Sequence, residues 1–202
     1  MKRAIPLLVA ITLLTSSAAS AASFYVTARS VGGVIVHIDG VINIGDDQKF
    51  ARIASRYPSA TTIVEPDSPG GYLGPALNIA EMIWRSGLDT ILYNYDRCSS
   101  ACTFIWLSGR HAVIQRNTPL CFHQSYDKDG KTDPQADEYV AGRLQNYGLT
   151  SYQAHALVTA APPESARCAT EWWAHRLGFQ PQVVLTPFAM SLCQSKFCLA
   201  AP

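Results

Sequence analysis

The sequence lacks a surplus of charge of either sign. It holds 16 lysines and arginines against 15 aspartates and glutamates, which gives a formal net charge of +1. A chain with this balance has no basic stripe to neutralise a row of phosphates, and this argues against a nucleic-acid partner. No second long apolar run follows the N-terminal one. A membrane-spanning helix needs about 20 apolar residues, so we expect no integral membrane span in the mature chain.

The sequence also lacks the ligand spacings of common metal sites. No two cysteines form a C-x-x-C pair, and the histidines are not spaced with the cysteines as zinc ligands would be. The acidic segment 127–138 begins like a calcium loop, but its glycine, Gly130, comes before the sixth position, where such a loop needs its sharp turn. We therefore expect neither a metal nor another cofactor, and we interpret this segment as a polar turn.

The cysteines are even in number, which favours disulfides over the competing zinc site. They are Cys98, Cys102, Cys121, Cys168, Cys193 and Cys198. In a chain exported to an oxidising compartment, we expect at least two disulfides. One candidate pair is Cys193 with Cys198. The other joins Cys98 or Cys102 to Cys121, although the spacing alone leaves every pairing open.

The first residues are typical of a secretory signal peptide. Lys2 and Arg3 precede an uncharged apolar run, which ends in small residues with Ala19 and Ala21 on either side of Ser20. We expect residues 1–21 to be removed, so that the mature chain begins at or near Ala22 and is periplasmic or secreted. Residues 22–202 fall within the usual length of one domain.

Segments rich in β-branched residues alternate with segments of helical periodicity. Predicted strands cover residues 33–43, 61–71, 89–95, 111–117 and 119–126. Predicted helices cover residues 46–58, 72–87, 134–148, 150–161 and 170–179, and another helix begins within segment 96–109. Strands that alternate with helices indicate βαβ units, and therefore an α/β fold with a mostly parallel sheet flanked by helices.

Two segments have the composition of an active site. The first is "DSPGG" (67–71), where the two glycines allow backbone N–H groups to point into a cleft and bind an oxyanion. An ordinary strand-to-helix turn has the same composition. The second is "DRCSSACTFIWLSG" (96–109), where two serines stand at the start of an apolar helix whose free N–H groups favour negative charge. One hydroxyl could be a nucleophile; alternatively, Ser99 caps the helix and Ser100 packs as a small residue.

A histidine follows in the segment "CFHQSY" (121–126). His123 belongs to a predicted strand beside the serine segment, and imidazole is the usual base for a serine hydroxyl near neutral pH. A lone strand histidine is more often structural. The other histidines are His37, His111, His155 and His175. None of them follows a serine segment by one strand pair.

The order of these parts resembles a known family. An S-P-G-G turn, a serine that opens an apolar helix ending in "LSG", and an "FHQ" strand are similar to the serine peptidases of the Clp protease proteolytic subunit, signal peptide peptidase A and their exported relatives. The resemblance spans about residues 33–179. It implies the ClpP/crotonase-like spiral of ββα units in a domain over 22–182, followed by a cysteine-containing tail over 183–202. It also implies a peptide or protein substrate and, as is common in this family, a homo-oligomer.

The resemblance assigns roles to individual residues. Ser100 matches the nucleophile, and His123 matches the general base. The amides of Gly70 and Ala101 match the oxyanion hole, with Gly71 beside them in a substrate-binding position.

The acid of the family is missing. An aspartate should stand shortly before a segment like "CATEWWAHRLGF", but this sequence has only Glu164 there. Either Glu164 orients His123, or Ser100 and His123 form a dyad in which a backbone carbonyl or a water accepts from the imidazole. We favour the dyad, because Pro162 and Pro163 stiffen the approach to Glu164.

The sequence therefore predicts an exported serine peptidase-like hydrolase that cleaves peptide bonds through a Ser100 acyl-enzyme. The departure at the acid leaves open an exported binding or assembly protein that keeps the fold without turnover. Acyl-CoA chemistry of the crotonase kind shares the fold, but an exported protein would seldom meet coenzyme A.

Overall fold

The computed structural model describes residues 21–169, 182–184 and 196–200. The predicted signal peptide apart from Ala21, the predicted helix at 170–179 and Cys193 lie outside the described residues. None of the helices within these ranges is long and apolar enough to cross a membrane.

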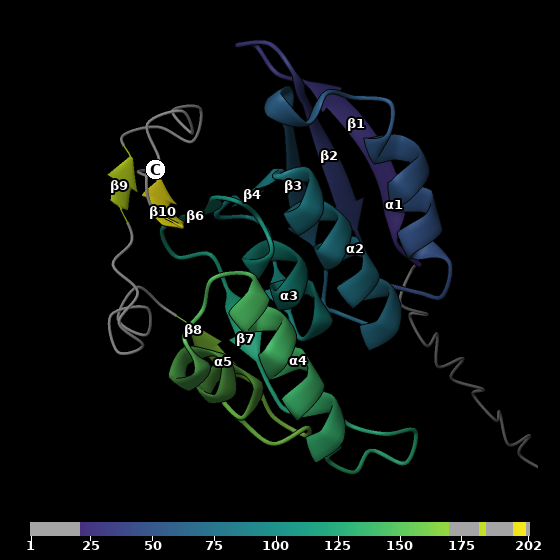
Figure 1. The fold of residues 1–202 in the computed structure, drawn as a ribbon, viewed down its shortest axis with the longest axis vertical. Helices are drawn as coiled ribbons and strands as arrows, with labels where there is room; N and C mark the ends of the chain where they lie inside the picture. The colour runs from purple at the N-terminus through teal and green to yellow at the C-terminus, as the bar shows by residue number, and fades with distance from the viewer. Residues whose placement is uncertain (1–20, 170–181, 185–195, 201–202) are drawn as a thin grey trace, which may run out of the picture.

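The strands form a larger and a smaller sheet (Figure 1). Those of the larger sheet are β1 Ser23–Ala28, β2 Val34–Asp39, β3 Thr62–Asp67, β4 Asp89–Leu92, β6 Ala112–Gln115, β9 Gln182–Val184 and β10 Phe197–Ala200. Their order is β1-β2-β3-β4-β6-β10-β9. Only β1 runs antiparallel to its neighbour in these described ranges. In the smaller sheet, β7 Leu120–Phe122 lies between β5 Cys98–Ser99, which is parallel to it, and β8 Arg167–Ala169, which is antiparallel.

Helices follow the strands, as expected for βαβ units. They are α1 Asp46–Ala54, α2 Leu73–Ser86, α3 Ala101–Leu107, α4 Pro134–Asn146 and α5 Ser151–Val158, with a short 3-10 turn at Ser59–Thr61. The predicted α/β class with a mostly parallel sheet flanked by helices is confirmed. The predicted helices other than 170–179 are all present, with ends a few residues shorter at their C-termini.

The helix α3 lies between two apolar clusters, and every one of its residues is buried. Ala101 and Ile105 belong to the cluster that joins α1 and α2 to strands β1, β2 and β3. Phe104 and Trp106 belong to the cluster that joins α2 to α4 and α5. A short helix that is apolar on all sides is stable only when it is surrounded in this way. The start of α3, where the serines stand, is therefore fixed from both sides.

Two disulfides are present among the residues that the structure describes, which confirms the predicted minimum. They join Cys98 to Cys102 and Cys121 to Cys168. The predicted bond from Cys98 or Cys102 to Cys121 is wrong, because the turn between β5 and α3 brings Cys98 and Cys102 to a Cα–Cα distance of 5.3 Å, where they bond to each other. Cys121, on β7, instead faces its partner in the antiparallel neighbour β8.

The two disulfides should differ in their effect on stability. The Cys121–Cys168 bond spans 47 residues and the Cys98–Cys102 bond only 4. From loop-closure entropy alone, replacing both members of the longer bond by alanine should lower the free energy of unfolding by about 4 kcal/mol, and replacing the shorter pair by about 2 kcal/mol. Urea denaturation of the two double variants checks this order. A larger loss for the Cys98 and Cys102 variant would show that local strain or packing dominates instead.

Candidate active site

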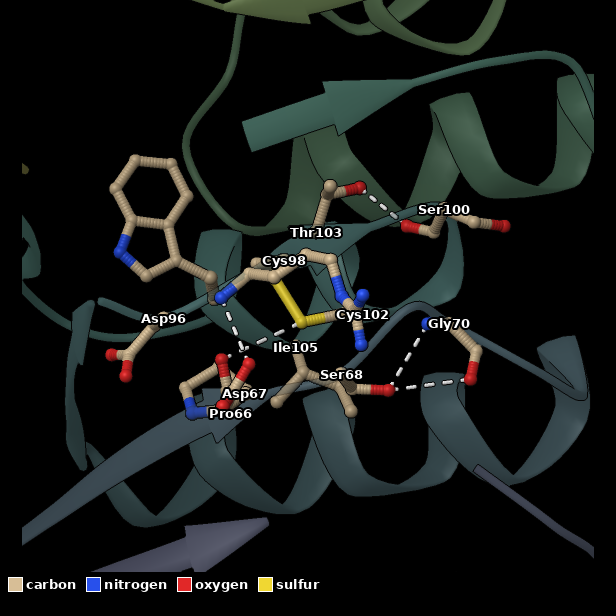
Figure 2. Close-up of a disulfide and its surroundings, with 12 residues drawn as sticks. Pro66, Asp67, Ser68, Gly70, Asp96, Cys98, Ser100, Cys102, Thr103 and Ile105 are labelled. Atoms are coloured by element: carbon tan, nitrogen blue, oxygen red, sulfur yellow. Dashed lines mark hydrogen bonds between the residues drawn. A yellow bond between two sulfur atoms is a disulfide. The ribbon is translucent and has the colours of Figure 1, made fainter. Parts of the chain in front are cut away.

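Ser100 stands at a sharp turn between β5 and α3 (Figure 2). It occupies the N-cap position of α3 with φ 55° and ψ −129°, and its side chain makes no capping hydrogen bond. A serine at positive φ is strained by roughly 1–3 kcal/mol, and such strain persists only where the surroundings enforce it. The alternative in which Ser99 caps the helix is wrong, because Ser99 belongs to β5.

Hydrogen bonds on both sides enforce this turn. The N–H of Ser100 donates to the carbonyl of Cys121 on β7, at 2.9 Å. The carbonyl of Ser100 accepts from the hydroxyl of Thr103 at 2.7 Å, a bond that Figure 2 shows. The hydroxyl of Ser100 forms no hydrogen bond within the described part of the chain. It is therefore available to react.

The S-P-G-G turn packs directly against Ser100. A Cβ added to Gly70 would lie 2.7 Å from Cβ of Ser100 and 3.2 Å from the amide nitrogen of Ala101, so only glycine fits there. Gly70 has φ 103°. Gly71 packs on the other side, where a Cβ would lie 2.2 Å from the carbonyl oxygen of Ile42. The S-P-G-G turn and the turn at Ser100 are therefore in direct backbone contact, with no space for a side chain at Gly70.

The two predicted oxyanion donors differ in their present partners. The amide of Ala101 is the first of α3 and has no acceptor within the helix. The amide of Gly70 donates instead to the buried hydroxyl of Ser68 at 3.0 Å, as Figure 2 shows. The Ser68 hydroxyl in turn donates to the Gly70 carbonyl at 3.2 Å. For Gly70 to bind an oxyanion, its N–H must be shared with, or released from, Ser68.

His123 follows β7 immediately, and β7 pairs with the strand that leads to Ser100. The register sets Ser99 opposite Cys121, which confirms the predicted neighbourhood of the serine and histidine segments. The Nδ1 of His123 lies 2.7 Å from the carbonyl oxygen of Gln124. Because a carbonyl only accepts, this contact requires the Nδ1–H form of the ring, in which Nε2 carries no hydrogen bond to the carbonyl. The ring stacks on the exposed ring of Tyr126 with centroids 5.7 Å apart.

Glu164 is not bonded to this histidine within the described residues. Its side chain is exposed, and it forms no hydrogen bond or ion pair with His123 within the described residues. The hydroxyl of Ser100 and the ring of His123 also form no hydrogen bond with each other there. Catalytic hydrogen bonds are often long until substrate binds.

Buried carboxyls lie on β3 and at the first residue of segment 96–109, and sequence reasoning missed them. Asp96 is 1% exposed and its Oδ2 accepts from the amide of Tyr93 at 2.6 Å. Burial, opposed by that hydrogen bond and reinforced by the charges of Glu65 and Asp67, raises the pKa of Asp96 to about 8. Glu65 itself lies 3.2 Å from Nδ1 of His37 on the adjacent strand. Single acidic residues at strand ends give no sequence signal for such a cluster.

Comparison with solved structures identifies proteins of the same fold. A mutant of the 1510-N membrane-bound stomatin-specific protease matches with a TM-score of 0.52 and 21% identity, over 71% of this chain and 74% of that one. Another mutant of that protease, in complex with a substrate peptide, matches with a TM-score of 0.56 and 17% identity, over 82% of this chain and 89% of that one. ClpP1 from Listeria monocytogenes matches with a TM-score of 0.54 and 16% identity, over 72% and 87%. The chain has the ClpP-like serine peptidase fold.

At these identities the comparison establishes the ClpP-like fold alone. No protein-family model matches the chain, and no curated protein matches it in sequence. The resemblance drawn from the S-P-G-G, serine and "FHQ" motifs is confirmed at the level of fold. The roles of Ser100, His123, Glu164, Gly70, Gly71 and Ala101 stay predictions.

Gly70→Ala should disable the serine. The added methyl would collide with Ser100 Cβ, so we expect the labelling rate of Ser100 by a fluorophosphonate probe to fall by about 100-fold or more. The matched control is Gly45→Ala, which has φ 90° but open space around the added carbon. Like Gly70→Ala, Gly45→Ala should introduce backbone strain of about 1–2 kcal/mol, but Ser100 should be labelled at the wild-type rate. Equal labelling of the two variants would contradict the close fit of Gly70.

Asp96→Asn should flatten the dependence of stability on pH. Because the pKa of Asp96 is higher in the folded chain than its ordinary 3.8, the folded state holds the proton, and the resulting stability is lost as pH rises toward 8. Between pH 5 and 9 the wild-type free energy of unfolding should therefore fall, by on the order of 2 kcal/mol from this group. Asparagine can keep the hydrogen bond from Tyr93 without the charge. Denaturation curves at several pH values measure this. The exposed control Asp39→Asn should keep the wild-type dependence of the free energy of unfolding on pH, and the same dependence in Asp96→Asn would refute the raised pKa of Asp96.

Proposed function

We propose that this chain is an exported serine peptidase-like hydrolase that cleaves peptide bonds through an acyl-enzyme on Ser100. The observation that carries the proposal is the strained backbone of Ser100, which holds an unbonded hydroxyl at a strand-to-helix turn against Gly70. Strain of this kind gathers at active sites, where it positions a reacting group in advance. A serine that served only to pack or to cap would not need it.

The proposed reaction begins at the base. Nε2 of His123 takes the proton of the Ser100 hydroxyl as Oγ attacks the peptide carbonyl. The amides of Ala101 and Gly70 stabilise the oxyanion, and one such donor is typically worth ~2.7–4 kcal/mol of barrier. His123 then gives its proton to the leaving amine, and the acyl group stays on Oγ. Water, deprotonated by the same nitrogen, releases the acid and restores the serine.

The substrate is proposed to be an extended peptide that lies beside the S-P-G-G turn. Main-chain hydrogen bonds along a strand edge would give affinity, and side-chain contacts would give preference. Gly71 is the proposed substrate-binding glycine next to the oxyanion hole. The stomatin-specific protease of the same fold holds a substrate peptide. Assembly into a homo-oligomer is proposed on the family resemblance alone.

Export is supported by two independent features. The N-terminal sequence has the order of a signal peptide, and the described part of the chain contains two disulfides, which persist in oxidising compartments. We therefore propose that the protein acts in the periplasm or outside the cell, after removal of residues 1–21.

One observation favours a second function, that of an exported binding or assembly protein without turnover. The N–H of Gly70 is occupied by Ser68, and no bond joins Ser100 to His123 within the described residues. A chain that had lost catalysis could keep the same turn for binding peptides alone. Reaction with a fluorophosphonate probe separates the two functions, since only an activated serine reacts.

Ser100→Ala and Ser99→Ala are the decisive pair of variants. We expect Ser100→Ala to lose fluorophosphonate labelling by at least about 10³-fold with an unchanged thermal unfolding midpoint, because only this hydroxyl stands at the strained turn. Ser99→Ala should label within a few-fold of the wild type. A silent wild type would favour the binding function, and a silent Ser99→Ala would move the nucleophile by one residue.

A further inference from the structure

The peptide group between Gln124 and Ser125 lies between two side chains that carry chemistry. Its carbonyl oxygen accepts the hydrogen bond from Nδ1 of His123, at 2.7 Å. Its N–H, which belongs to Ser125, donates to Oδ1 of Asp137, also at 2.7 Å. The imidazole and the carboxylate are therefore connected through one peptide unit. Within the described residues, His123 and Asp137 form no direct bond with each other.

Asp137 is placed for this contact by the start of α4. It stands in the first turn of that helix, where a negative charge is favourable, and it is 5% exposed. Its second oxygen, Oδ2, is buried and has no hydrogen-bond partner within the described residues. Within the described residues, the Asp137 carboxylate accepts its hydrogen bond from the N–H of Ser125. A buried carboxylate with a single donor polarises that donor strongly, because little else screens its charge.

The peptide group is held in place by its neighbours along the chain. The N–H of Gln124 donates to the carbonyl of Ala161 at 2.8 Å. The carbonyl of Ser125 accepts from the N–H of Asp133 at 2.8 Å, at the N-cap of α4. The unit that links His123 to Asp137 is therefore fixed by the segment after α5 on one side and by the N-cap of α4 on the other. Its orientation is a property of the fold.

We propose that Asp137 is the positioning acid for His123 and acts through the Gln124–Ser125 peptide group. This inference rests on the proposed function of Ser100 and His123. A carboxylate that accepts from an N–H draws electron density toward the carbonyl of the same peptide, which makes that oxygen a better acceptor for Nδ1–H. The ring is thereby held as the Nδ1–H form with Nε2 toward the serine, and the charge that develops on it is stabilised. Asp137 takes the place that sequence reasoning offered to Glu164, with the peptide carbonyl as the direct acceptor.

The kinetic test measures labelling of Ser100 by a fluorophosphonate in Asp137→Asn. Asparagine keeps an acceptor for Ser125 and removes only the charge. Replacing an acid in direct contact with the histidine cost ~10⁴ in rate, so we expect a smaller loss here, about 10- to 100-fold at saturating probe, with the half-saturating concentration unchanged. The matched control is Glu138→Gln, which removes an exposed charge from the next position of α4 and should label as the wild type. Labelling of Asp137→Asn within twofold of the wild type, or an equal loss in Glu138→Gln, would overturn the proposal.

A second readout does not depend on activity. In nitrogen-15 NMR spectra of the Ser100→Ala protein, His123 should show the Nδ1–H form, and adding Asp137→Asn should shift that proton upfield and speed its exchange. An unchanged Nδ1–H resonance would refute the role of Asp137 even if labelling fell. If the wild type never reacts with the probe, the proposed hydrolase function fails, while the spectra still decide this inference. If Asp137→Asn does not fold, the Ser125 amide of the parent protein should still appear at low field and exchange slowly; fast exchange would contradict the link.

Discussion

The close contact between Gly70 and Ser100 is the constraint on which the rest of the site depends. Two strands, β3 and β5, deliver two backbone turns to the same point, and there is no room for a side chain on one of them. Ser100 adopts a strained backbone there, one residue before the first amide of α3. This strain can be maintained because α3 is buried on every side and cannot rotate away.

The same arrangement connects the serine to the histidine without a direct bond. Backbone hydrogen bonds tie Ser100 to β7, and β7 leads to His123. The longer disulfide fixes β7 to β8, and the shorter one fixes β5 to α3. The proposed proton path therefore crosses elements that are joined by disulfides and backbone hydrogen bonds. Packing and these bonds therefore hold the segments that carry Ser100 and His123 relative to each other.

The motifs predicted the fold class and the pairing of the serine segment with the strand before His123, because each depends on local composition and strand order. Three things could not be predicted. The short strands β5 and β8 exist only through their pairing with β7, and the disulfides follow from that pairing. The backbone angle of Ser100 is imposed by a residue 30 positions away in sequence, Gly70. Asp137 reaches the site from α4, where a single aspartate resembles an ordinary helix-start residue. Sequence position offered Glu164 as one of two ways to orient His123, and its side chain is exposed.

The proposed mechanism requires that the Ser100 hydroxyl is nucleophilic and faces the oxyanion site formed by the amides of Ala101 and Gly70. The most direct measurement is a crystal structure of the mature protein after reaction with a fluorophosphonate. We predict phosphorus bonded to Oγ of Ser100, its oxygen within about 3 Å of the Ala101 amide, and Nε2 of His123 facing Oγ. Phosphorus on Ser99, or a phosphoryl oxygen directed into solvent away from Gly70 and Ala101, would contradict the account.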